Sequence, residues 1–415
     1  QGRRDGYGTW RAMLLERRAG RNSRGRPSSP GRAGARRFDY ALAVPRLLAL
    51  VLLAVTALPA WADVTRLEIT RREVVLNGRA FGAAGPYEKL VGTVHFALDP
   101  KAPRNQGIVD LALAPRNAAG LVEWSADVYI LKPVDPARGN GRVFYEAGNR
   151  GTKRILPVFQ NGAGSTDPTT AADFGNGALM QQGYTLVWMG WQWDVPEGRM
   201  RMAIPIATND GARITGLVRG NFIPGAKATT ALIADRGHLA YPVLNPESAE
   251  HVLYVRTLPT DTPQVVPRAR WRFSGEAQIT MDGGFEAGRI YDVVYRAHSP
   301  RVVGLGLAGT RDLVSFLKHA SAADGNPSPG LRWAMGWGVS QTGRFLRHYV
   351  YEGFNEDTEG RIVTWNRRFA DMWELPEEVL ESRDDARAIE CALRLLADPG
   401  TFVAKVQQLY DHPEA

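Results

Sequence analysis

The sequence predicts an α/β fold with parallel strands at the centre of its sheet, and the order of its apolar segments is the main observation behind this prediction. Two strand-like segments are followed by a helical segment that ends at Gly183 and then by a short, largely apolar strand. Strand, helix, strand in this order is typical of parallel sheets. The same alternation returns after residue 310. In chain order, the expected elements are strands 126–131 and 142–146, helix 171–182, strand 184–189, helix 311–319, strand 331–337 and helix 341–351.

Two regions depart from this alternation. Residues 64–98 contain segments in which apolar and polar residues alternate, which predicts a β-rich N-terminal region. Residues 197–290 contain short β-like runs separated by proline and glycine, which predicts a β-rich insertion in the α/β domain. Because inserted segments often carry binding loops, we expect the insertion to shape a substrate pocket.

Composition excludes several classes of protein. Of the 415 residues, 44% are hydrophobic and 23% are charged, which argues against a disordered chain and against a membrane protein with many spans. Cys391 is the only cysteine, so a disulfide framework and a cysteine-rich metal site are ruled out. The seven histidines show no metal-ligand spacing. We therefore expect neither a metal nor another cofactor.

The net charge of +8 is concentrated at one end of the chain. Residues 1–46 carry twelve arginines and three carboxylates, a net charge of +9, so the remaining 369 residues have a net charge of −1. A folded part that is almost neutral has no electrostatic footprint for a phosphate backbone. Nucleic acid is therefore not an expected partner.

The arginines precede a segment that is typical of a secretory signal peptide. An uncharged apolar run, residues 47–58, follows Arg46 and leads into Ala60-Trp61-Ala62, a small-residue cleavage pattern. The run is shorter than the roughly 20 residues of a membrane span, so a permanent anchor is the weaker alternative. We expect residues 1–62 to be a disordered basic extension plus a signal peptide. Cleavage after Ala62 would leave a periplasmic or secreted protein without a stable membrane span.

Residues 332–347 are the most informative for chemistry, because they place Ser340 where an apolar strand meets a helix. A nucleophilic hydroxyl has to project from a sharp strand-to-helix turn, and nearby glycines let the backbone double back. Gln341, the first helical residue, would then offer its N–H to the oxyanion that forms on an attacked acyl group. The usual pattern is G-x-S-x-G, and Thr342 stands where the second glycine is expected. The alternative interpretation is a serine that caps an ordinary helix.

A second segment, residues 142–153, begins as a strand and ends in a polar loop that contains glycine. In hydrolases with such a serine, the loop after another strand supplies the second N–H of the oxyanion hole. Asn149, Arg150 and Gly151 are candidates for this donor, and the residues alone do not choose among them. The alternative is a loop that caps a helix or orients the substrate.

The same segments carry a resemblance to known proteins. Residues 145–153, 167–188 and 338–357, the last with Ser340-Gln-Thr-Gly, resemble a family of large, mostly uncharacterised bacterial α/β-hydrolase domain proteins. The similarity begins near residue 64 and ends near residue 361. It implies an α/β-hydrolase-like domain over residues 63–360. It also implies a secreted serine hydrolase of the esterase type that acts on a small-molecule carboxylic ester, with Ser340 as the nucleophile.

The C-terminal segment does not fit a hydrolase. In the α/β-hydrolase order, the acid and the histidine of the triad both follow the nucleophile, and 75 residues follow Ser340 here. Residues 361–415, with Trp365, Asn366 and Phe369, resemble the start of a PAS-type sensor module and have a mostly helical pattern. We therefore expect a truncated hydrolase domain that lacks its triad acid and histidine, with impaired activity and a fusion or assembly junction near residue 360.

The histidines do not supply an obvious base. His348 lies eight residues after Ser340 on the predicted helix. That spacing is roughly 12 Å along the axis at about 1.5 Å per residue, too far for a hydrogen bond to the hydroxyl. His412 lies in the C-terminal segment, and the other five histidines precede Ser340, contrary to the order of the triad.

Three other observations leave alternatives open. Gly304-Leu-Gly306-Leu-Ala-Gly309 matches the dinucleotide-binding pattern, but that fingerprint needs a strand directly before it, so we favour a loop that lets a helix pack tightly. Four tryptophans near the ends of predicted strands either line an aromatic pocket or belong to the core: Trp188, Trp191, Trp193 and Trp337. The competing function is a non-catalytic binding or sensor protein with the PAS-like segment as its signalling input. The signal peptide argues against it, because no membrane span follows residue 58.

Overall fold

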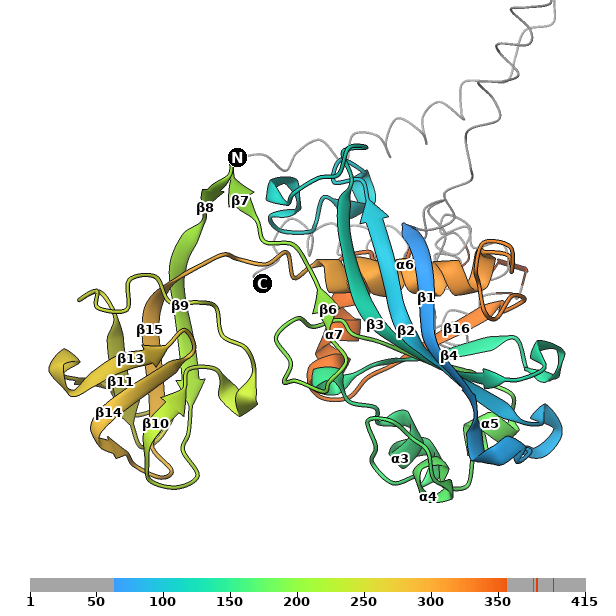
Figure 1. Ribbon diagram of the computed structural model, residues 1–415, viewed down its shortest axis with the longest axis horizontal. Coiled ribbons are helices and arrows are strands. Elements are labelled where there is room, and N and C mark those ends of the chain that lie inside the picture. The colour runs from blue at the N-terminus through green and yellow to red at the C-terminus, as the bar shows by residue number, and fades with distance from the viewer. Residues whose placement is uncertain (1–62, 357–375, 377, 380–390, 392–415) are drawn as a thin grey trace, which may run out of the picture. The chain divides into compact units, whose positions relative to one another are not determined.

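The computed structural model describes residues 63–356, 376, 378–379 and 391. All of them belong to one compact unit, residues 59–415, and the description below is confined to them (Figure 1). The predicted basic extension and signal peptide, residues 1–62, lie outside the described residues. So does almost all of the PAS-like segment, residues 361–415.

The expected α/β-hydrolase-like fold with a parallel-centred sheet is wrong. The described residues form sixteen strands and five α-helices, and the strands are arranged in mixed and antiparallel sheets. One physical reason lies in the predicted helix 171–182. It is divided into two four-residue helices, α4 (Ala171–Phe174) and α5 (Ala178–Gln181), because Gly175 and Gly177 between them have φ values of 54° and 67°. A right-handed helix does not continue through such residues.

The largest sheet has seven strands in the order β1-β2-β3-β5-β4-β16, with β6 also paired to β3. Only the β5–β4 and β4–β16 pairs are parallel, and the pairs among β1, β2, β3, β5 and β6 are antiparallel. The strands are β1 (Val64–Val74), β2 (Tyr87–Leu98), β3 (Val122–Pro133), β4 (Arg142–Ala147), β5 (Thr185–Met189), β6 (Met202–Ala203) and β16 (Trp333–Trp337).

The alternation of side chains along the central strands builds two apolar cores, because successive residues of a strand face opposite sides of the sheet. On one side Ile130, Val143 and Val187 pack with the longest helices, α6 (Leu305–His319) and α7 (Gln341–Tyr351). On the other side the core includes Leu131 and Phe144 and continues into α3 (Ile155–Gln160), α4 and α5. Strands β4 and β5 are therefore almost wholly buried.

Residues 208–298 form three antiparallel sheets (Figure 1). The four-stranded sheet has the order β12-β11-β15-β9, the three-stranded sheet the order β10-β14-β13, and β7 pairs with β8. The two larger sheets share one apolar core. The strands are β7 (Thr208–Asn209), β8 (Ala212–Arg213), β9 (Thr215–Phe222), β10 (Ala228–Leu232), β11 (Val252–Arg256), β12 (Gln264–Val266), β13 (Trp271–Gly275), β14 (Gln278–Phe285) and β15 (Ile290–His298).

The glycines of the dinucleotide-like pattern allow helix α6 to pack closely. A Cβ atom at Gly306 would lie 2.4 Å from the carbonyl oxygen of Trp191, and one at Gly309 would lie 2.1 Å from the ring of Trp124. The strand before α6, β15, is antiparallel to both of its neighbours. This arrangement fits the packing interpretation and lacks the parallel βαβ unit that the dinucleotide fingerprint needs.

In the part of the chain that the structure describes, none of the helices has both the length and the apolar character that crossing a membrane requires.

Candidate active site at the turn between β16 and α7

Ser340 occupies a strained turn between strand β16 and helix α7. It is the N-terminal flanking residue of α7, and its backbone has φ 58° and ψ −113°. Residues with a Cβ atom rarely adopt this conformation, which costs of order 1–3 kcal/mol. The residue is exposed, and it makes no side-chain cap to α7. An exposed hydroxyl on a strained backbone is therefore presented at this turn, and the capping alternative for Ser340 does not hold.

Glycine and threonine side chains explain how the backbone doubles back. A Cβ atom at Gly338 would lie 2.6 Å from the carbonyl oxygen of Thr342, so only glycine fits there. The buried Thr342 hydroxyl accepts a hydrogen bond from the Val339 N–H at 2.9 Å and donates one to the Val339 carbonyl at 3.1 Å. Thr342, the residue that departs from G-x-S-x-G, thus ties the turn together. Sequence reasoning missed this role, although the threonine hydroxyl was the available signal.

The structure brings the second predicted segment next to this turn. Strands β4 and β16 are parallel neighbours, and their register pairs Glu146 with Trp337. The loops that follow them therefore emerge at the same edge of the sheet. The Asn149 side-chain amide donates a hydrogen bond of 3.2 Å to the carbonyl of Val339, the residue before Ser340, although 190 residues separate the two.

The loop after β4 narrows the choice of oxyanion donor. Residues Asn149–Gly151 form a 3-10 turn in which Arg150 has φ 51° and its guanidinium donates to the Asn149 side-chain oxygen at 2.8 Å. The N–H of Gly151 already donates to the Gly148 carbonyl at 3.4 Å, which leaves Asn149 and Arg150 as the N–H candidates of this loop. On the other side, Gln341 begins helix α7, where the first N–H groups have no partner within the helix.

Glu146 anchors the end of the loop after β4 through hydrogen bonds to the backbone at the start of α3. Its buried carboxylate accepts hydrogen bonds from the N–H groups of Arg154 at 2.8 Å and Ile155 at 2.9 Å, at the start of α3. It also accepts one from the Trp188 indole at 2.5 Å. Burial raises the pKa of Glu146, and the backbone hydrogen bonds counteract that effect. Trp188 is therefore a core residue that holds Glu146.

Lys153 lies near the end of the same loop, and its side chain is buried. It is only 6% exposed, its ammonium lies 4.2 Å from the centre of the Tyr129 ring, and it donates to the Thr166 carbonyl at 2.5 Å. Burial lowers the pKa of Lys153 to about 8 from an ordinary value of 10.5, although the nearby carboxylate of Asp167 opposes this shift. The loop thus carries an ammonium group that loses its proton close to neutral pH.

The lowered pKa of Lys153 predicts a pH-dependent stability. Between pH 8 and pH 10.5 the unfolded chain still binds the Lys153 proton while the folded protein has released it, so folding is favoured as the pH rises through this window. Comparison with Lys153→Met isolates this effect from other titrating groups. We expect the wild type to gain up to roughly 3 kcal/mol relative to the variant across the window. Urea unfolding at intervals of half a pH unit measures it, and a constant difference would contradict the assignment.

Five of the six histidines in the described part of the chain have identified contacts with residues other than Ser340. His348 lies on α7 with its Nδ1 3.8 Å from a Glu352 carboxylate oxygen, and His238 pairs with Asp194 at 3.0 Å. Three further contacts join His95 to Glu68, His251 to the Asn245 carbonyl, and His298 to Ser299. His412 lies outside the described residues. None of these contacts joins a histidine to Ser340, so they do not identify a general base for its hydroxyl.

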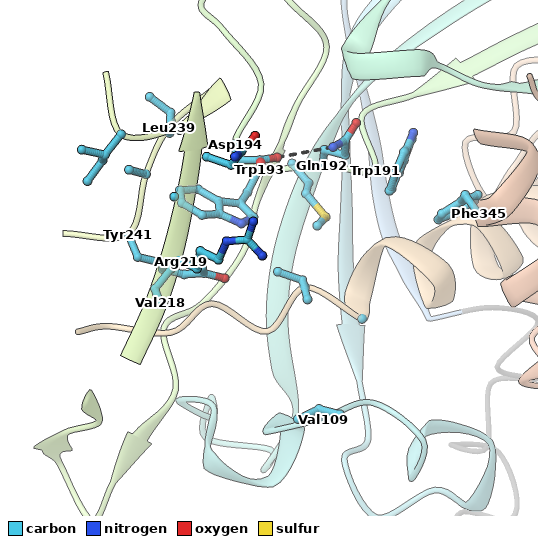
Figure 2. Close-up of a pocket in the computed structure, with 18 of the residues that line it drawn as sticks. Val109, Trp191, Gln192, Trp193, Asp194, Val218, Arg219, Leu239, Tyr241 and Phe345 are labelled. Carbon is cyan, nitrogen blue, oxygen red and sulfur yellow. Dashed lines mark hydrogen bonds between the residues drawn. The ribbon is translucent and has the colours of Figure 1, made fainter. Parts of the chain in front are cut away.

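A cavity of about 800 Å³ is lined in part by Phe345 and His348 of α7 (Figure 2). The Trp191 indole, which lines it, donates to the Gly148 carbonyl at 2.8 Å, and its ring packs on Phe345 with centroids 4.3 Å apart. Trp193 lines the cavity too, as a sequence-predicted pocket residue, whereas Trp337 packs on Phe159 instead. Neither Ser340 nor the loop after β4 lines the cavity, and Trp191 connects the cavity to that loop through the Gly148 carbonyl.

Within the described ranges, no group of three or more histidine, cysteine or acidic side chains is arranged to hold a metal ion. Comparison of the chain with protein-family models, with curated proteins and with solved structures finds no match. The functional assignment therefore depends on the residues of the site itself.

Proposed function

We propose that this protein is an exported serine hydrolase that cleaves a small-molecule carboxylic ester, with Ser340 as its nucleophile. The observation that carries the proposal is the backbone of Ser340, with φ 58° and ψ −113° at an exposed strand-to-helix turn. A strain of this kind persists only where the surrounding structure maintains it, and such residues cluster at functional sites. The sharp strand-to-helix turn is also the geometry by which nucleophilic serines are exposed.

The residues around Ser340 supply two parts of the reaction. Attack of the Ser340 hydroxyl on the ester carbonyl forms a tetrahedral oxyanion, and the N–H of Gln341 and that of Asn149 or Arg150 would stabilise its charge. Collapse of the intermediate releases the alcohol and leaves an acyl group on Ser340. Water then cleaves the acyl-enzyme to give the carboxylic acid and free serine.

The third part is a base for the hydroxyl proton, and none of the five histidines described above is hydrogen-bonded to Ser340. Without a base, a serine nucleophile retains only binding and oxyanion stabilisation. We therefore expect this chain to hydrolyse esters slowly, and we expect a small base from solution to raise the rate, since Ser340 is exposed.

The proposal is tested with p-nitrophenyl butyrate and added imidazole, which serves as the missing base. We expect imidazole to raise the protein-dependent rate by about 10- to 100-fold. Ser340→Ala measures the background reaction of imidazole with the ester and is expected to have no protein-dependent rate. A wild-type rate equal to that of Ser340→Ala at every imidazole concentration would contradict the proposal and favour a binding protein.

A further inference from the structure

The cavity beside α7 has the features of a binding site for one part of the substrate. It is lined by residues from the loop after β5, from β9, from the loop after β10 and from α7 (Figure 2). We propose that it binds a bulky, uncharged group that contains aromatic rings. This inference depends on the proposed function only for the idea that the bound group belongs to an ester.

Aromatic side chains at two places in the cavity favour a ring-containing ligand. Trp191 packs on Phe345 with centroids 4.3 Å apart, and Trp193 packs on Tyr241 with centroids 5.2 Å apart. Figure 2 shows the first pair on the side of α7 and the second pair on the side of β9. The guanidinium of Arg301 lies 4.9 Å from the centre of the Trp193 ring, which holds that indole in place. A volume of about 800 Å³ lies toward the upper end of the range for small-molecule sites.

The charged side chains that line the cavity are already paired, which favours an uncharged ligand. The carboxylate of Asp194 lies 3.0 Å from Nδ1 of His238. The guanidinium of Arg219 lies 2.7 Å from the carboxylate of Asp292, which also accepts a hydrogen bond from Asn221 at 2.7 Å. A charged ligand would lose its hydration without gaining an unpaired opposite charge here, at a substantial cost in free energy.

Gln192 lines the cavity but does not offer it a free acceptor. Its side-chain N–H group is directed to the Asp194 carboxylate, 3.5 Å away, which fixes the orientation of the amide (Figure 2). The other end of the amide, Oε1, is buried and has no hydrogen-bond partner among the described residues. A ligand in the cavity would not reach this buried oxygen, so the aromatic side chains determine what the cavity binds.

The cavity and the strained serine are connected through Trp191. This indole donates to the carbonyl of Gly148, which directly precedes the candidate oxyanion donors, and its ring contacts α7 at Phe345. A ring system held against Trp191 would therefore lie next to the loop that carries the candidate oxyanion donors.

Isothermal titration calorimetry with three probes tests the inference: 2-naphthol, 2-methoxynaphthalene and 2-naphthoate. We expect 2-naphthol and its methyl ether to bind with affinities within about threefold of each other, because the cavity contacts their rings, and we expect the carboxylate to bind at least tenfold more weakly. Equal affinities for all three probes, or no binding of 2-naphthol, would overturn the inference.

A pair of variants tests the location. Ala240 lines the cavity, so Ala240→Phe should weaken the binding of 2-naphthol at least tenfold by filling the space. Val265→Phe is the matched control, because Val265 is 61% exposed on β12 and does not line the cavity. Circular dichroism checks that both variants fold. Binding that survives Ala240→Phe in a folded protein would place the ligand elsewhere.

All titrations are repeated in Ser340→Ala, so that a failure of the cavity inference can be told apart from a failure of the proposed function. If the probes bind as expected while the ester assay shows no dependence on Ser340, the cavity inference stands and the proposed function fails. If Ser340 is required for hydrolysis while none of the probes binds, the proposed function stands and the cavity inference fails.

Discussion

The Ser340→Gly variant is expected to unfold at a higher denaturant concentration than the wild type while losing all ester hydrolysis. With φ 58° and ψ −113°, Ser340 has a conformation that is the mirror image of an ordinary extended one, which glycine adopts freely. Relief of a strain of roughly 1–3 kcal/mol is partly offset by the greater freedom of glycine in the unfolded chain, about 0.4–1 kcal/mol. We therefore expect a net gain of about 1 kcal/mol, measured by urea unfolding.

Ser340→Ala is the control for that experiment. Alanine retains the Cβ atom and therefore the strain, so its stability should stay within about 0.5 kcal/mol of the wild type. It also lacks the hydroxyl, so both variants should be inactive. A Ser340→Gly protein that is less stable than Ser340→Ala would show that the backbone at this turn is not strained.

The second large effect is expected at Glu146. Replacement by leucine would leave the N–H groups of Arg154 and Ile155 and the indole of Trp188 without an acceptor in a buried place. Each orphaned donor costs about 1–3 kcal/mol, so we expect Glu146→Leu to lose about 3–5 kcal/mol of unfolding free energy. Because this carboxylate holds the loop of Asn149, hydrolysis that depends on Ser340 should fall as well.

Two further variants test whether the loss of stability comes from the hydrogen bonds that the Glu146 carboxylate accepts. Glu146→Gln keeps one acceptor oxygen and should lose about half as much stability as Glu146→Leu. Glu286→Leu replaces a glutamate whose side chain is 68% exposed, and it should change stability by less than about 0.5 kcal/mol. A loss in Glu146→Leu no larger than that in Glu286→Leu would contradict the role assigned to Glu146.

The sequence predicted individual strands better than their assembly. The apolar runs that became β4 and β5 were recognisable because both strands are almost wholly buried, whereas Ala334 is the one buried residue of β16. The number of strands in the sheet and their directions could not be predicted in the same way. The pairing of β1, β2, β3 and β6 depends on contacts between segments that are distant in the sequence. The helix predicted at 171–182 failed for a local reason, since the positive φ angles of Gly175 and Gly177 interrupt it.

The candidate site was predicted in part for the same reasons. The glycines around Ser340 and the polar loop at Asn149 are visible as local patterns, and the structure brings them together through the parallel register of β4 and β16. The role of Thr342 and the unpartnered oxygen of Gln192 depend on atomic contacts that spacing does not encode. Both therefore emerged only from the structure.

The covalent step at Ser340 provides the most direct test of the proposed function. The protein is mixed with p-nitrophenyl butyrate and imidazole, quenched in acid and digested, and the peptides are analysed by mass spectrometry. A butyryl group on the peptide that contains Ser340, and its absence in Ser340→Ala, is the expected result. Ester hydrolysis by the wild type with the acyl group on a different residue, or with the same rate in Ser340→Ala, would contradict the assignment of Ser340 as the nucleophile.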